Sequence, residues 1–108
     1  LIILNKRSDF LAANSAKRTA SGGLVLLVRD RADGNQQMRV GFTVTKKIGN
    51  AVIRNRMKRR FREIARAALP EHGIEGADHV IIGRASGVER DFSALQNDLH
   101  RALRMVAG

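Results

Sequence analysis

The sequence contains no cysteine. This absence excludes a disulfide framework, a thiolate metal site and a cysteine nucleophile, and it suits a reducing compartment, so we expect a cytoplasmic location. The 108 residues are enough to bury an apolar core without covalent support. We therefore expect residues 1–108 to form a single domain.

Long hydrophobic runs are absent as well. No apolar stretch approaches the roughly 18 residues that a membrane span requires, so we expect no membrane partner. The opening run LIIL is too short for the apolar region of a signal peptide, and it lacks an initiator methionine. We expect that further residues of the natural protein precede it.

Aromatic and acidic residues are scarce. Four Phe, without Trp or Tyr, argue against a domain that stacks rows of bases, such as an RNA-recognition motif. The chain has 20 Lys and Arg but only 10 Asp and Glu, which gives a net charge of +10. The excess is concentrated in residues 46–66, KKIGNAVIRNRMKRRFREIAR, where nine residues are basic and only Glu63 is acidic. So concentrated a positive charge predicts a polyanionic partner.

The same segment is expected to form a helix. Asn50 can cap its first turn, and Pro70 is expected to end it at about Leu69. Apolar residues recur at helical spacing in a stripe roughly 120° wide. The stripe consists of Ile53, Met57, Phe61, Ile64, Ala65 and Ala68. The side opposite this stripe carries Lys58, Arg59, Arg62 and Arg66, together with Asn55. One flank carries Arg56 and Arg60, and Arg54 lies at the rim of the stripe.

A charged helix face is often only a solvated surface. Such a surface normally mixes acidic and basic residues four apart, which stabilises the helix. Here like charges crowd together between residues 54 and 62, and their repulsion favours a partner that neutralises them. Arg binds phosphate in a bidentate way and the start of a helix attracts phosphate, so we expect a nucleic acid. A DNA reader is disfavoured, because the preceding hairpin leaves no helix-turn-helix.

The remaining pattern predicts an α+β two-layer sandwich in the order αββαβα. The expected elements are a helix at 4–14 capped by Ser8, a loop at 15–23, strands at 24–28 and 39–45, the basic helix, a strand at 78–84 and a helix from Asp91. The second strand alternates, with Thr43 and Thr45 on its polar face. The last helix should bury a stripe that begins at Phe92.

A self-sufficient nuclease is one alternative. The titratable candidates are His72, His79, His100, Asp78, Asp91 and Asp98. Strand alternation points Asp78 and His79 to opposite faces, and no carboxylate cluster suits two Mg²⁺ ions. We interpret all six as ordinary surface or cap residues and expect no catalytic residue in this chain.

The stretch GFTVTKKIGNAVIRNRMKRRFRE resembles the protein subunit of bacterial ribonuclease P. The family signature is a basic run that ends in Arg-Asn-Arg, which stands here as Arg54-Asn55-Arg56. Other matching positions are Lys46, Lys47, Gly49, Asn50, Ala51, Lys58 and Arg59. The resemblance extends to KRSDF at 6–10, to RVGFTVTKK at 39–47 and, more loosely, to VIIGR at 80–84.

The resemblance implies a fold and a function. The small sheet would contain a left-handed β-α-β crossover, as in a ribosomal protein domain, against the usual handedness. The chain would be the non-catalytic protein subunit of an endoribonuclease whose RNA subunit is catalytic. That enzyme removes the 5′ leader of precursor tRNA in a reaction that requires Mg²⁺. The RNA subunit and the substrate would hold the Mg²⁺. The resemblance implies no obligate protein partner.

The resemblance also implies binding residues. Contacts with ribonuclease P RNA would come from Lys46, Lys47, Asn50, Arg54, Asn55, Arg56, Lys58 and Arg59. A cleft lined by Phe10, Thr43 and Thr45 would hold the leader of precursor tRNA. Many relatives have an aromatic residue at the position of Asn14, and some have a Tyr at the position of Leu27. The cleft of this chain would therefore contain fewer groups on which bases can stack. The alternative is a structural rRNA-binding protein of ribosomal type.

Overall fold

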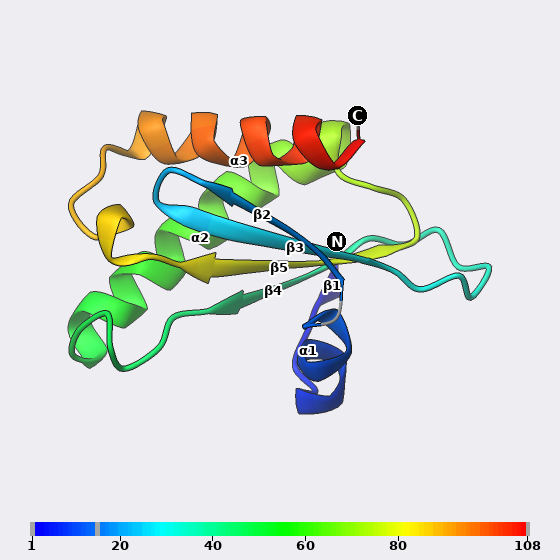
Figure 1. The fold of residues 1–108 in the computed structure, drawn as a ribbon, viewed down its shortest axis with the longest axis horizontal. Helices are drawn as coiled ribbons and strands as arrows, with labels where there is room; N and C mark the ends of the chain where they lie inside the picture. The colour runs from blue at the N-terminus through cyan, green and yellow to red at the C-terminus, as the bar shows by residue number, and fades with distance from the viewer. Residues whose placement is uncertain (1, 15, 108) are drawn as a thin grey trace.

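A mixed sheet of five strands runs through the computed structural model, which describes residues 2–14 and 16–107 (Figure 1). The strands are β1 (Ile2–Ile3), β2 (Lys17–Ser21), β3 (Leu24–Asp30), β4 (Arg39–Thr43) and β5 (Ala77–Gly83). The helices are α1 (Arg7–Ala13), α2 (Ala51–His72) and α3 (Phe92–Ala107), and a short 3-10 helix, η1 (Ala85–Gly87), follows β5. None of the helices in this described part is both long and apolar enough to cross a membrane.

The strands lie in the order β1-β4-β5-β3-β2. β3 pairs antiparallel with β2 and β5, whereas β4 pairs parallel with β1 and β5. α2 connects the parallel neighbours β4 and β5 and passes behind the sheet in the view of Figure 1, so this crossover is left-handed. The predicted α+β fold is confirmed.

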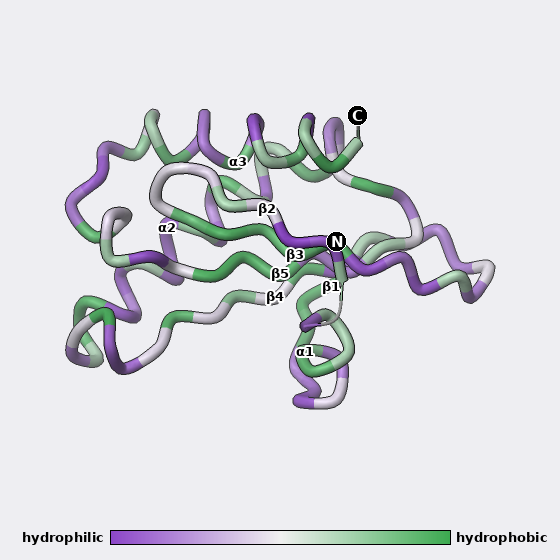
Figure 2. Tube along the Cα trace, viewed as in Figure 1, coloured by the Kyte–Doolittle hydropathy of each residue, from purple (hydrophilic) through white to green (hydrophobic). Residues whose placement is uncertain are grey.

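Helices cover the two faces of the sheet unequally. On one face α2 and α3 enclose the larger core, which includes Leu26, Phe61, Ile64, Ile81, Leu95 and Leu99. On the other face α1 covers a smaller cluster of Leu4, Ala13, Val25, Leu27 and Val80, with Phe10 and Ile82 beside it. β3 and β5 are therefore covered on both sides, and each contains an apolar run, at 24–28 in β3 and 80–82 in β5 (Figure 2).

The predicted loop at 15–23 is wrong, because its residues 17–21 form β2 (Ser15 lies outside the described residues). The strand does alternate, with Thr19 and Ser21 buried. Its buried positions carry small polar side chains, so a search for apolar periodicity does not detect it. With β1 as a second unpredicted strand, the sheet has five strands rather than three.

The predicted start of the first helix is also wrong. α1 begins at Arg7 rather than Leu4, because Leu4 is extended and its amide donates to the Val40 carbonyl (2.7 Å). Lys6 precedes the helix without a side-chain cap, so Ser8 is not the cap. Pairing with the sheet overrides the local helical pattern here.

The predicted end of the basic helix is wrong by three residues. α2 continues through Pro70 to His72. A proline in the last turn removes only one amide donor, and the amide of Gly73 still bonds to the Leu69 carbonyl (2.8 Å). The helix therefore ends within one turn after the proline rather than before it.

Three of the six titratable residues assigned to the surface are fully buried: Asp78, His79 and Asp98. Asp78 accepts hydrogen bonds from arginine side chains of β4 and of the loop after β3. Asp98 accepts from the Gly23 amide (3.0 Å) and from both Nε and Nη2 of Arg90 (2.6 and 3.0 Å). Each carboxylate thus joins separate elements of the fold, Asp78 through Arg31 and Arg39 and Asp98 through Gly23 and Arg90.

His79 is buried between the end of α2 and the start of β4. Its Nε2 accepts a hydrogen bond from the Ile74 amide (3.0 Å), and its Nδ1 lies 3.2 Å from the Arg39 carbonyl. The two partners assign the proton to Nδ1, which donates to that carbonyl. The imidazole is therefore neutral and cannot take up a second proton without losing the bond to Ile74.

The pKa of each of these three groups lies below its ordinary value. Burial would raise the pKa of Asp78 and Asp98, but hydrogen bonds from arginine side chains, and for Asp98 from the Gly23 amide, outweigh it. Burial lowers the pKa of His79. In each case the group takes up its proton at a higher pH in the unfolded chain than in the folded chain. Acid therefore destabilises the folded state.

We expect the melting temperature to decrease as the pH is lowered past about 6.5, because His79 gains a proton in the unfolded chain. The decrease should become steeper below about pH 4, where Asp78 and Asp98 gain protons in the unfolded chain. Circular dichroism melts across this range measure the effect. In the His79→Asn variant the first decline should be missing and the second retained. A melting temperature that is constant down to about pH 3.5 would contradict the prediction.

Candidate nucleic-acid interface

α2 begins where the sequence predicts. The Asn50 side chain accepts a hydrogen bond from the Ile53 amide (3.0 Å), so the predicted cap is confirmed. Met57, Phe61 and Ile64 of the apolar stripe are buried against the sheet. Their burial fixes the rotation of the helix and therefore the direction of every basic side chain on it.

The basic residues of α2 form three rows around this stripe. Arg54 and Lys58 are partly buried along the side next to β4. Arg56 and Arg60 lie on the opposite flank, where each guanidinium donates to a backbone carbonyl of the segment after η1. Between the two rows lie the exposed residues Asn55, Arg59, Arg62 and Arg66. The flank predicted for Arg56 and Arg60 is thus confirmed.

Acidic residues compensate little of this charge. Among the described residues, Arg66 is the one Lys or Arg of α2 that forms an ion pair, with Glu63 at 3.4 Å, and both side chains are exposed. An exposed pair of this kind contributes little. α2 therefore presents a net positive face to solvent, and a polyanion can relieve the repulsion within it.

Lys46 and Lys47 extend this face beyond the start of the helix. Both are exposed in the turn between β4 and α2. A hydrogen bond from the Ile48 amide to the Thr45 carbonyl (3.0 Å) closes the turn. The structure therefore brings the two lysines next to the first turn of α2, where the free amides also favour phosphate.

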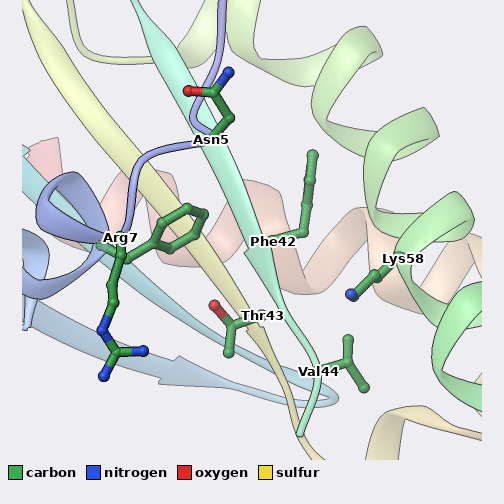
Figure 3. Close-up of a pocket in the computed structure, with 7 residues that line it drawn as sticks. Asn5, Arg7, Phe42, Thr43, Val44 and Lys58 are labelled. Carbon is green, nitrogen blue, oxygen red and sulfur yellow. The ribbon is translucent and has the colours of Figure 1, made fainter.

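A groove of about 380 Å³ opens along β4, between α1 and α2 (Figure 3). Its lining consists of Asn5, Arg7, Phe10, Phe42, Thr43, Val44 and Lys58. β1 pairs only with Arg39 and Val40, so the rest of β4 is an open edge. In Figure 3 the Lys58 side chain points from α2 toward the strand, and Arg7 lies on the far side of the strand.

Phe10 is seated against Gly41 of β4. A Cβ at Gly41 would lie 2.6 Å from two carbons of the Phe10 ring and 3.1 Å from the Leu4 Cβ. Only glycine allows this approach. The ring is partly exposed and lines the groove, so it can offer an aromatic surface beside the cations Arg7 and Lys58.

The structure brings together two of the three residues predicted for the leader cleft. Phe10 and Thr43 both line the groove, whereas Thr45 is exposed beyond the end of β4 and is not part of the lining. Asn14 lies at the end of α1, outside the lining. Leu27 is only 1% exposed under α1, so it cannot contact a ligand.

Sequence reasoning missed Arg7 and assigned Lys58 to the outer face alone. Arg7 lies one turn before Phe10 on α1, and that spacing was the available signal. One further feature points to an anion: the Nε atom of Arg54 is buried and has no hydrogen-bond partner among the described residues. Unpaired buried donors are rare, and a phosphate or base oxygen could satisfy this one.

The described residues contain no group of three or more His, Asp or Glu that could hold a metal ion. The buried carboxylates do not fit Mg²⁺ either, because guanidinium groups already occupy the oxygens of Asp78 and Asp98. The residues present therefore do not suit a dedicated metal site.

The left-handed α+β sandwich, its uncompensated basic helix and the adjoining groove define a protein of the RNA-binding class. The family model for ribonuclease P matches residues 2–107. The ribonuclease P protein component of Erythrobacter litoralis is 54% identical over 102 residues, which cover 94% of this chain and 83% of that protein. The chain belongs to the family of ribonuclease P protein components.

Solved structures agree with this assignment. The ribonuclease P protein from Thermotoga maritima superposes with a TM-score of 0.83 at 31% identity, covering 97% of each chain. The ribonuclease P protein of Staphylococcus aureus also gives a TM-score of 0.83, at 27% identity, covering 98% of this chain and 95% of that one. The predicted family is confirmed.

Proposed function

We propose that this chain is the protein component of a ribonuclease P, in which an RNA subunit performs the hydrolysis. The outer face of α2 binds that RNA subunit, and the groove beside β4 binds the 5′ leader of precursor tRNA. The uncompensated charge of α2 carries the proposal, because it directly adjoins a groove that holds an aromatic ring.

The RNA subunit is contacted by residues in the turn before α2 and in the first turns of that helix, on its outer face and on both flanks. They are Lys46, Lys47, Asn50, Arg54, Asn55, Arg56, Lys58 and Arg59. Their guanidinium and ammonium groups neutralise phosphates, and each contact releases condensed counterions. Arginines supply bidentate contacts that fix the orientation of the RNA on the helix.

The leader is held by groups on three elements. A base can stack on Phe10, the hydroxyl of Thr43 can bond to a base or sugar, and Arg7 and Lys58 attract the phosphates. Thr45 would contact the leader only where it continues past the end of β4. Such a groove accepts a single strand whose bases are unstacked, as a leader is.

Mg²⁺ enters this proposal through the RNA. The carboxylates of this chain do not suit the ion, so the RNA subunit and the substrate hold it. The chain's contribution is to reduce repulsion between the phosphates that surround the ion, which lowers the Mg²⁺ concentration that cleavage requires.

The test is a cleavage assay at low Mg²⁺ with 5′-labelled precursor tRNA and a bacterial ribonuclease P RNA, with and without this protein. We expect the mature 5′ end only when both are present. A basic protein of equal charge is the control, since rescue by charge alone would speak against the proposal. Cleavage by this protein without RNA would also contradict it.

In the same system, replacing Arg54 and Arg56 with alanine should weaken binding to the RNA subunit. The slope of log affinity against log salt should fall by about 0.7–0.9 for each lost phosphate contact. The matched control removes the same charge elsewhere, with Arg18→Ala and Arg104→Ala at exposed positions of β2 and α3. An unchanged slope in the first variant would refute the role given to these two residues.

A further inference from the structure

Phe92 departs from its expected place in the core. It is the first residue of α3 and is 40% exposed, although the helix stripe predicted it to be buried. Of the other three Phe, Phe61 is fully buried, and Phe10 and Phe42 are partly buried. Phe92 is thus the most exposed of the four Phe.

The surroundings of Phe92 are basic. A groove of about 410 Å³ lies between the start of α3 and the outer side of α2. Its lining consists of Arg59, Arg60, Arg62, Glu63, Arg66 and Phe92. None of these residues lines the groove beside β4, although Arg62 and Arg66 also line a smaller groove with Val40 and Phe42 of that strand.

Charge in this groove is positive and partly fixed in place. Four guanidinium groups surround one carboxylate, that of Glu63, which is paired with Arg66 at 3.4 Å. The guanidinium of Arg60 donates to the Arg90 carbonyl, which holds it beside α3. Arg59 and Arg62 are exposed and form no ion pair among the described residues, so they are free to bind anions.

An isolated exposed apolar side chain needs no explanation. Here, however, the ring lines the same groove as four guanidinium groups. Proteins bind unpaired nucleotides with this combination of an aromatic face, on which a base stacks, and cations that neutralise the phosphates of the nucleic acid. Since α2 already carries the cations for an RNA partner, the occupant that matches both features is RNA.

We propose that Phe92 and the arginines of this groove bind an unpaired nucleotide of the RNA subunit, whose base stacks on the Phe92 ring. Arg59 and Arg62 contact the phosphates on either side of that base. This inference rests on the proposed function, because it places a single-stranded position of the same RNA at the outer side of α2. It adds a base contact to an interface that otherwise contacts phosphates.

Two variants test the site. Phe92→Leu keeps an apolar side chain but removes the aromatic ring, and it should weaken binding to a bacterial ribonuclease P RNA on the order of tenfold. The salt slope should be unchanged, because no charge is lost. Circular dichroism melts of the variant check that the fold is retained.

Phe92→Trp provides a direct signal. The chain has no Trp and no Tyr, so this residue would be the sole strong fluorophore. We expect its emission to be quenched by the RNA subunit, and not by dextran sulfate, a polyanion without bases. Equal quenching by both polyanions would overturn the stacking site.

The failure of this inference is distinguishable from failure of the proposed function. If Phe92→Leu binds the RNA as tightly as the parent while the Arg54→Ala, Arg56→Ala double variant binds more weakly, only the stacking site is wrong. If neither variant changes binding, the proposed interface on α2 is wrong as well.

Discussion

Replacing Asp78 with alanine is expected to lower the free energy of unfolding by about 3 kcal/mol. Asp78 is fully buried and accepts two hydrogen bonds from Arg39, both 2.7 Å, and one from Arg31 at 2.9 Å. Arg29 completes the set at 3.5 Å. The variant would leave guanidinium groups at the edge of the core without their anion. Its cost is at the lower end for a broken buried pair, because Arg29 and Arg39 still reach solvent.

The position of Asp78 explains why the effect is large. The carboxylate joins three neighbouring strands, since Arg29 belongs to β3 and Arg39 to β4. Arg31 in turn bonds to the carbonyls of Asn35 and Gln37, and so orders the connection between those strands. Loss of one carboxylate therefore loosens a whole end of the sheet.

Urea denaturation of the variant measures the loss, and Asp33→Ala is a matched control. Asp33 also pairs with Arg31, at 3.0 Å, but its side chain is exposed. Removing it should cost much less than removing Asp78, because solvent screens the exposed pair. Equal losses in the two variants would show that burial of Asp78 adds nothing.

These buried carboxylates show where reading the sequence fails. Periodicity and capping describe a segment by its own residues, and for α2 this was sufficient: the Asn50 cap, the apolar stripe and the flank of Arg56 all follow from local rules. An aspartate looks the same whether it is solvated or buried. The burial of Asp78 depends on Arg39 and Arg31, which lie 39 and 47 residues earlier in the chain. No local sequence pattern connects residues so far apart.

The residues of the candidate site likewise fall into those that the sequence predicted and those that it missed. The resemblance and the strand alternation together predicted Phe10 and Thr43, and both line the groove. Arg7 entered only with the fold, because α1 packs on the face of the sheet opposite to α2 and brings Arg7 to the groove beside β4. Phe92 was misplaced because the end of a helical stripe need not be covered, and coverage is decided by the neighbouring element. Polar β2 was missed because its buried residues are not apolar.

Because we propose that the groove beside β4 binds the leader, we expect Gly41→Val to weaken binding of precursor tRNA by the reconstituted enzyme on the order of tenfold and to leave binding of mature tRNA unchanged. The added Cβ would lie 2.6 Å from the Phe10 ring, so the ring and α1 must move away from β4. The base-stacking surface of the groove would move with them. The overpacking should also cost about 1–3 kcal/mol of stability.

Binding of precursor tRNA with and without its leader separates the two effects. The control is Ala20→Val, which adds two methyl carbons at an exposed position of the far edge strand β2 and should leave both affinities unchanged. A double-mutant cycle with Phe10→Ala locates the clash, because removing the ring makes room for the valine. The stability cost of the double variant should therefore be smaller than the sum of the single costs. If Gly41→Val loses stability but keeps the full preference for precursor, the leader does not lie in the groove beside β4.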